Sequence, residues 1–265
     1  MMLQELSIQR SVHVVFWTLI LAQLVLVTCH VGAIVWDAAA PSNVTEIVRS
    51  FFELSKEGNA PTWFSSFLFT LIGLACGAIY FVEKQTLSDV ATVERLRPAW
   101  LVFAAAFLFL SFDETSQLHE RLDWLMSGFS EGGQASTPVE AQDADELPFY
   151  RYLLIYVPVL AALGLAMAWF VISRFRDTTT SLLFLLGMGL LGMKLVIESF
   201  EKWSLSMTWF NHSVYLETVI VEMCCLFTGA TIIVTSLLRH LAKLCHGEDE
   251  HGARSASIAP SPIRG

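Results

Sequence analysis

The chain has 265 residues, of which 54% are hydrophobic and 15% are charged. Soluble domains carry about 25% charged residues, so this composition excludes an ordinary soluble protein. The net charge of −9 argues against a nucleic-acid-binding protein, because binding nucleic acid requires a basic face.

Six apolar blocks follow one another along the chain. At 1.5 Å per residue, a helix of about 20 residues crosses a hydrocarbon core of about 30 Å. The blocks lie at about 12–36, 61–82, 98–120, 152–173, 178–201 and 213–238. The sequence therefore predicts an all-α, polytopic membrane helix bundle with about six transmembrane helices, forming one domain over residues 1–245.

Proline and glycine suggest local features of two of these helices. Pro158 lies inside the fourth block, where a missing backbone N–H is expected to kink the helix. Gly187, Gly189 and Gly192 in the fifth block would let a neighbouring helix approach closely, since glycine has no side chain to hold it away.

Two polar segments lie outside the apolar blocks. Residues 123–149 are rich in acidic residues and are expected to form an exposed loop. Residues 246–265 contain few apolar side chains, and their composition is typical of a disordered tail.

Lys and Arg residues are about twice as frequent on one side of the predicted helices as on the other. The richer side has Arg10, Lys84, Arg95, Arg97, Arg174, Arg176, Arg239, Lys243, Arg254 and Arg264. The poorer side has Arg49, Lys56, Arg121, Arg151 and Lys202. Because cytoplasmic segments carry the excess of positive residues, both termini and the 246–265 tail are predicted to be cytoplasmic, and loop 123–149 to face outward. The short connections favour the bacterial inner membrane.

The ionisable and polar residues within the blocks gather in the outer half of the predicted bundle. They are His30, Asp113, Glu114, His119, Glu120, Lys194, Glu198, His212, Tyr215, Glu217 and Glu222. A charged group at bilayer depth is costly and usually faces a cavity or a partner. The inner half is predicted to hold almost no ionisable group, so any chemistry is expected in the outer half.

The helical repeat brings some of these residues onto shared faces. Asp113 and Glu120 lie two turns apart on one face, and Lys194 and Glu198 are one turn apart. Glu222 lies about 15 Å below the start of its helix at 1.5 Å per residue, close to the membrane midplane. If the third, fifth and sixth helices meet, these side chains share one cavity.

Carboxylates and a histidine from several helices are how helix bundles bind metal ions. The predicted metal ligands are Asp113, His119, Glu120, Glu198 and Glu222. The metal would be Zn²⁺ or a dinuclear Fe or Mn centre, and Glu114, Lys194, Tyr215, His30 and His212 would complete the polar cluster.

One short motif carries a resemblance. Phe112-Asp113-Glu114 followed by His119-Glu120 resembles a helix-end pattern in uncharacterised bacterial polytopic membrane proteins. The resemblance covers about a dozen residues and implies no particular activity.

Four functions fit this pattern and stay open at this point. The first is a metal-dependent membrane enzyme that acts on a lipid or periplasmic substrate, with Glu217 as the general base. The second is a proton or cation transporter component with Glu222 as the relay. The third is a haem or quinone anchor with His30, His119 or His212 as ligands. The fourth is a non-catalytic assembly or sensory subunit. The lipid bilayer is the one partner that the sequence indicates.

Overall fold

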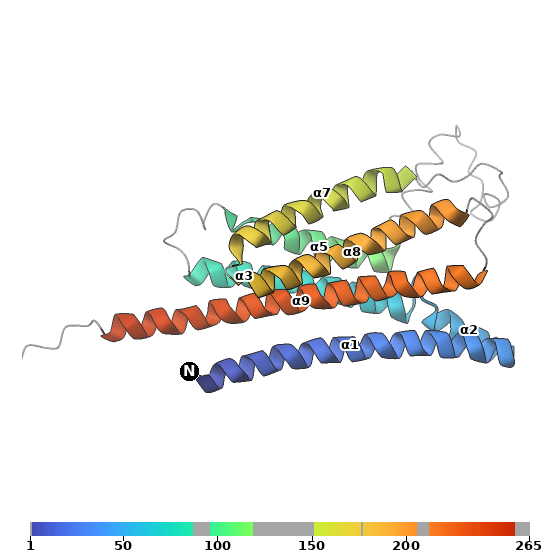
Figure 1. The fold of residues 1–265 in the computed structure, drawn as a ribbon, viewed down its shortest axis with the longest axis horizontal. Coiled ribbons are helices and arrows are strands. Elements are labelled where there is room, and N and C mark those ends of the chain that lie inside the picture. The colour runs from blue at the N-terminus through green and yellow to red at the C-terminus, as the bar shows by residue number, and fades with distance from the viewer. Residues whose placement is uncertain (1, 87–95, 119–150, 176, 206–211, 258–265) are drawn as a thin grey trace, which may run out of the picture.

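A computed structural model describes residues 2–86, 96–118, 151–175, 177–205 and 212–257, and over these residues the secondary structure is helical. The helices are α1 (Met2–Ala39), α2 (Asn43–Phe52), α3 (Ala60–Thr86), α5 (Ala99–Ser116), α7 (Arg151–Arg174), α8 (Thr178–Leu205) and α9 (His212–Ser257). The long helices run side by side along one direction, and α2 lies at the end of the bundle opposite the N-terminus (Figure 1).

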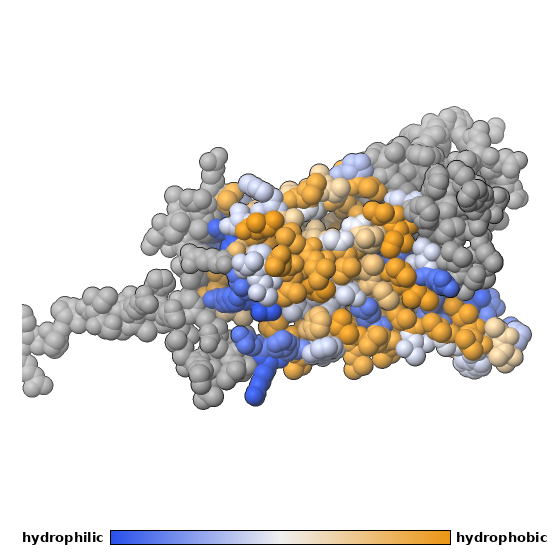
Figure 2. Space-filling view, in the orientation of Figure 1, coloured by the Kyte–Doolittle hydropathy of each residue, from blue (hydrophilic) through white to orange (hydrophobic). Residues whose placement is uncertain are grey.

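Every described helix except α2 is long and apolar enough to cross a membrane. Hydrophobic residues cover the middle of the face in Figure 2, and hydrophilic residues lie toward its two ends. The predicted fold class, an all-α bundle with six helices of membrane-spanning length, is confirmed.

Several helices differ in length from the predicted blocks, and α1 begins at Met2, ten residues before its block. α5 ends at Ser116, because Gln117 adopts a left-handed conformation (φ 54°) and its N–H donates to the carbonyl of Asp113. α9 continues to Ser257. Residues 246–257, expected in a disordered tail, therefore extend a helix. The expectation rested on missing apolar residues, which a helix leaving the membrane does not need.

α9 lies at the centre of the bundle and contacts α1, α3 and α8. Its closest approach is to α8, where a Cβ built on Gly187 would lie 2.7 Å from the carbonyl oxygen of Gly229. Gly189 and Gly192 have no such neighbour within 4 Å. Of the three glycines predicted to allow close packing, Gly187 is therefore the one at the contact.

α1 is joined to α9 by a polar contact at bilayer depth. The side-chain amide of Gln23 donates to Thr228 Oγ1 at 2.9 Å, and the Thr228 hydroxyl lies 3.2 Å from Gln23 Oε1. Apart from α2, the next element along the chain, α9 is the main helix that α1 contacts.

Candidate functional site

The ammonium of Lys194 on α8 lies among carboxylates. Its Nζ donates to Glu198 Oε2 one turn further along the same helix, and it lies 3.4 Å from Glu222 Oε1 on α9. Glu114 on α5 is close enough to act on Lys194 electrostatically. We call Glu114, Lys194, Glu198 and Glu222 the Lys194 cluster.

Glu114 is held in place by hydroxyl groups between α3 and α5. Ser65 Oγ donates to Glu114 Oε2 at 3.0 Å. One turn deeper, the Ser66 hydroxyl donates to the carbonyl of Ser111 at 2.9 Å, and the Ser111 hydroxyl lies 2.8 Å from those of Ser66 and Thr70. With α8 and α9, four helices therefore contribute to this site.

The centre of the Lys194 cluster lies deep in the bundle. Glu222 is ten residues from the start of α9, and Lys194 is eleven residues from the end of α8, which place both about 15 Å from the outer helix ends. The side chains of Lys194, Glu198 and Glu222 are 19%, 17% and 12% exposed. Lys194 and Glu222 each lie five residues inside the end of an apolar span, Thr178–Ser199 and Glu217–Cys245, so these largely buried charges are within the membrane-spanning part of the bundle.

The remaining predicted site residues are distributed differently. Asp113 is buried on α5, one position from Glu114, and Glu217 is exposed on α9. His30 is buried at the outer end of α1, where its Nδ1 accepts the backbone N–H of Leu54 at 3.3 Å. His119 and Glu120 lie outside the described residues, as do the side chains of His212 and Tyr215.

The arrangement around Lys194 does not fit a metal ion between Glu198 and Glu222. Both carboxylates contact the ammonium, which would repel a divalent cation at that point. In the part of the chain that the structure describes, no group of three or more His, Cys, Asp or Glu side chains is placed to hold a metal. Metal ligation that involves His119 and Glu120 stays a prediction.

Ionisable side chains are also buried at the opposite end of the bundle, which corrects the expectation of an inner half almost without them. Glu83 of α3 accepts a 2.5 Å hydrogen bond from Arg174 of α7, and its side chain is 2% exposed. His240 of α9 is buried, and its ring stacks on Phe175 with centroids 4.3 Å apart.

Sequence reasoning missed Glu83 and Arg174 because each directly follows an apolar block, where a charged side chain is ordinarily at the headgroup level. The position of these two residues relative to the blocks did not indicate that their side chains would be buried. His240 lay beyond the predicted end of the sixth block, and only the longer α9 brings its ring into the aromatic core.

An ion pair between Asp177, which lies just before the Thr178–Ser199 span, and Lys243 joins the start of α8 to α9. Asp177 Oδ2 accepts hydrogen bonds from the ammonium of Lys243 and, at 2.6 Å, from the Thr180 hydroxyl. These two donors stabilise the ionised form and hold the pKa of the Asp177 carboxyl below its usual range. Asp177 also accepts the backbone N–H of Thr179 at 3.2 Å and so caps α8.

Comparison with known proteins gives a family but no assigned activity. No curated protein and no solved structure matches the chain. A domain of unknown function (DUF8692) matches residues 18–241, from the first membrane-length helix to the last. Because that match covers well over half of the sequence, the chain belongs to the DUF8692 family.

Proposed function

We propose that this multi-pass membrane protein takes up and releases protons at the Lys194 cluster, as a component of a transporter for protons or for a solute moved together with protons. The observation that carries the proposal is the gathering of ionisable groups around Lys194. Glu198 and Glu222 contact its ammonium, and Glu114 is close enough to act on it electrostatically, within the membrane-spanning part of the bundle.

Carboxylates that lie close together interact strongly in a medium of low dielectric constant. Glu198 and Glu222 both contact the Lys194 ammonium, so the charge on one affects the proton affinity of the other, and the members bind protons as a coupled group. A coupled group of this kind gains or loses a proton when the charges around it change.

Two further observations favour transport over metal-dependent hydrolysis. Lys194 holds the place between Glu198 and Glu222 that a metal would need. Glu83 and His240 supply buried ionisable groups near the other end of the bundle, where a proton would have to leave. Ionisable residues on both halves of a helix bundle are typical of proton pathways.

The test begins at the cluster itself. Infrared difference spectra of the protein in liposomes, recorded during a pH titration, detect the C=O stretch of protonated carboxylic acids. We expect a reversible carboxylic-acid band that is lost or shifted in Glu222→Gln. The matched control is Glu217→Gln, which changes an exposed carboxylate on the same helix and should leave the band unchanged.

Transport is measured in the same liposomes with a trapped pH-sensitive dye and an imposed potassium diffusion potential. The wild type and Glu217→Gln should carry protons at similar rates, and Glu222→Gln should lose most of the flux. Equal flux in all three proteins, with no carboxylic-acid band that depends on Glu222, would refute the proposal.

A further inference from the structure

α2 is an amphipathic helix that the apolar-block pattern did not predict. Its apolar residues recur at i, i+3, i+4, i+7 and i+8, which places them on one face of a helix. They are Val44, Ile47, Val48, Phe51 and Phe52. With ten residues, α2 is about 15 Å long and cannot cross a bilayer.

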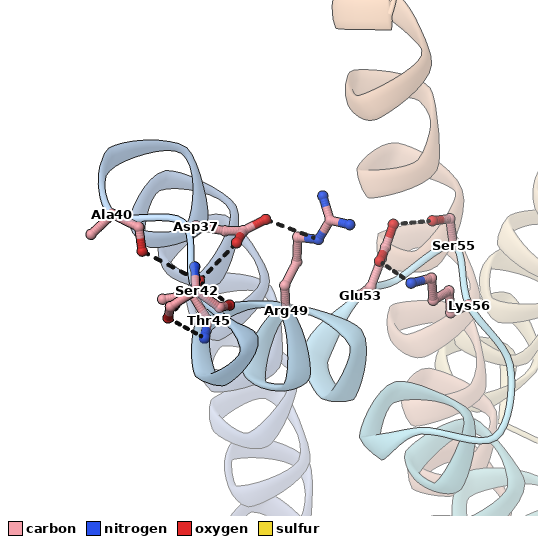
Figure 3. A network of polar contacts seen from close by, with 8 residues as sticks. All are labelled: Asp37, Ala40, Ser42, Thr45, Arg49, Glu53, Ser55 and Lys56. Atoms are coloured by element: carbon pink, nitrogen blue, oxygen red, sulfur yellow. Dashed lines mark hydrogen bonds and ion pairs between the residues drawn. The ribbon is translucent and has the colours of Figure 1, made fainter.

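Polar contacts fix one side of α2 against the end of α1 (Figure 3). Asp37 of α1 accepts a hydrogen bond from the Thr45 hydroxyl at 2.8 Å and pairs with Arg49 Nε at 3.4 Å. Thr45 is buried, and Ser42 caps the helix by accepting the backbone N–H of Thr45 at 3.2 Å. The polar face is therefore the face that is held by the protein.

The residues after α2 are also tied to the bundle. The N–H of Leu54 donates to the buried ring of His30, and the Asn59 amide donates to the carbonyl of Glu53 at 2.6 Å. Both ends of α2 are thus anchored, and its direction at the outer end of the bundle is set by the protein.

The apolar face of α2 is left uncovered. Val44 is 61% exposed, Ile47 68% and Phe51 45%. Phe51 makes an edge-to-face contact with Trp63 at the start of α3, with centroids 6.3 Å apart, and Trp63 is itself exposed. The uncovered face is therefore continuous with the exposed apolar surface of α3, which faces lipid in a membrane-spanning helix.

We infer that α2 lies in the plane of the membrane surface and buries its apolar face, Val44, Ile47 and Phe51, in the phospholipid leaflet at the outer end of the bundle. α2 connects the ends of two membrane-length helices, so it is held at the level of the headgroups. Helices with one apolar and one polar face bind at this depth, and exposed tryptophans such as Trp63 are typical of it.

Spin labels on neighbouring positions test the inference. α2 contains no cysteine, so Ile47→Cys and the control Glu46→Cys are made in a protein whose native cysteines are replaced, and both are reconstituted in phosphatidylcholine–phosphatidylglycerol liposomes. Glu46 is exposed on the opposite, polar face, at nearly the same position along the helix. Dissolved oxygen should relax the Ile47→Cys label several-fold more than a water-soluble nickel chelate does, and the order should reverse for Glu46→Cys.

Each other outcome overturns the inference. A label at position 47 that the nickel chelate reaches as well as it reaches position 46 would show that the face is in water. A label at position 47 that neither reagent reaches would show that another protein or a second copy covers it. The result does not depend on proton exchange at the Lys194 cluster.

Discussion

Buried charges lie beside opposite charges in both halves of the bundle. Glu83 pairs with Arg174, and the Glu83 side chain is 2% exposed. In the Lys194 cluster one ammonium contacts Glu198 and Glu222 and is near Glu114, so the charge of each member affects the others.

Removal of the central cation should destabilise the protein. Lys194→Met removes the ammonium that contacts Glu198 and Glu222, and breaking a buried ion pair costs about 3 kcal/mol. The thermal unfolding midpoint in detergent is expected to fall. The double variant Lys194→Met/Glu222→Gln should regain part of the loss, because it also removes one of the two carboxylates that the ammonium contacted. A double variant less stable than the single one would contradict this account of the cluster.

The Asp177–Lys243 pair should make stability depend on pH in the acidic range. The pKa of the Asp177 carboxyl is lower in the folded protein than in the unfolded chain, where it is about 3.9. The stabilisation is therefore complete above that value and is lost as the pH falls through and below it. Unfolding midpoints of the wild type and Asp177→Asn should differ at neutral pH and converge in acid. A difference that stays constant into acid would contradict this account, because asparagine caps a helix as well as aspartate does and the substitution removes only the charge.

The position of a residue along its helix could be predicted, but its direction could not. Glu222 was placed about 15 Å from the start of its helix, and it lies ten residues into α9, which is the same distance at 1.5 Å per residue. Glu114 was expected in the polar cluster and is close enough to act on Lys194 electrostatically, whereas the metal ligation expected of its neighbour Asp113 stays a prediction. The rotation of a helix about its own axis depends on packing against its neighbours, and this packing cannot be read from a single sequence.

At the scale of elements, long apolar runs predicted their helices well and short or polar ones poorly. The six spans were found because about 20 apolar residues leave few alternatives. α2 was missed because it has only ten residues, so its helical repeat of apolar side chains is too short to form a membrane-length block. The end of α5 was misplaced because the left-handed conformation of Gln117 has no strong signal in a residue that is not glycine.

The contact between α8 and α9 should tolerate no side chain at its closest point. Gly187→Ala would place a methyl group 2.7 Å from the carbonyl oxygen of Gly229, and overpacking of this kind costs about 1–3 kcal/mol. Gly189→Ala, on the same helix, meets no neighbour and should be neutral or slightly stabilising, since alanine is the better helix former. Unfolding midpoints measured side by side check this, and equal midpoints would place the helix contact elsewhere.

For the whole molecule, the orientation predicted from Lys and Arg can be tested at the exposed Cys245 near the inner end of α9. A membrane-impermeant maleimide should label it in inside-out vesicles and leave it unlabelled in intact cells. Cys245→Ser in the same preparations identifies the signal. Labelling in intact cells would reverse the orientation and place the Lys194 cluster in the cytoplasmic half.

The packing of α1 on α9 has a consequence for biosynthesis. Gln23 and Thr228 are 205 positions apart in the chain, so α1 leaves the ribosome well before α9, and the Gln23 amide contacts Thr228 only after α9 has been made. Until then the side-chain amide of Gln23 faces lipid, and its exposure distinguishes an incomplete chain from the folded protein. Chains that stop before α9 would display that amide permanently, and the membrane's quality-control proteases would have a simple feature by which to remove them.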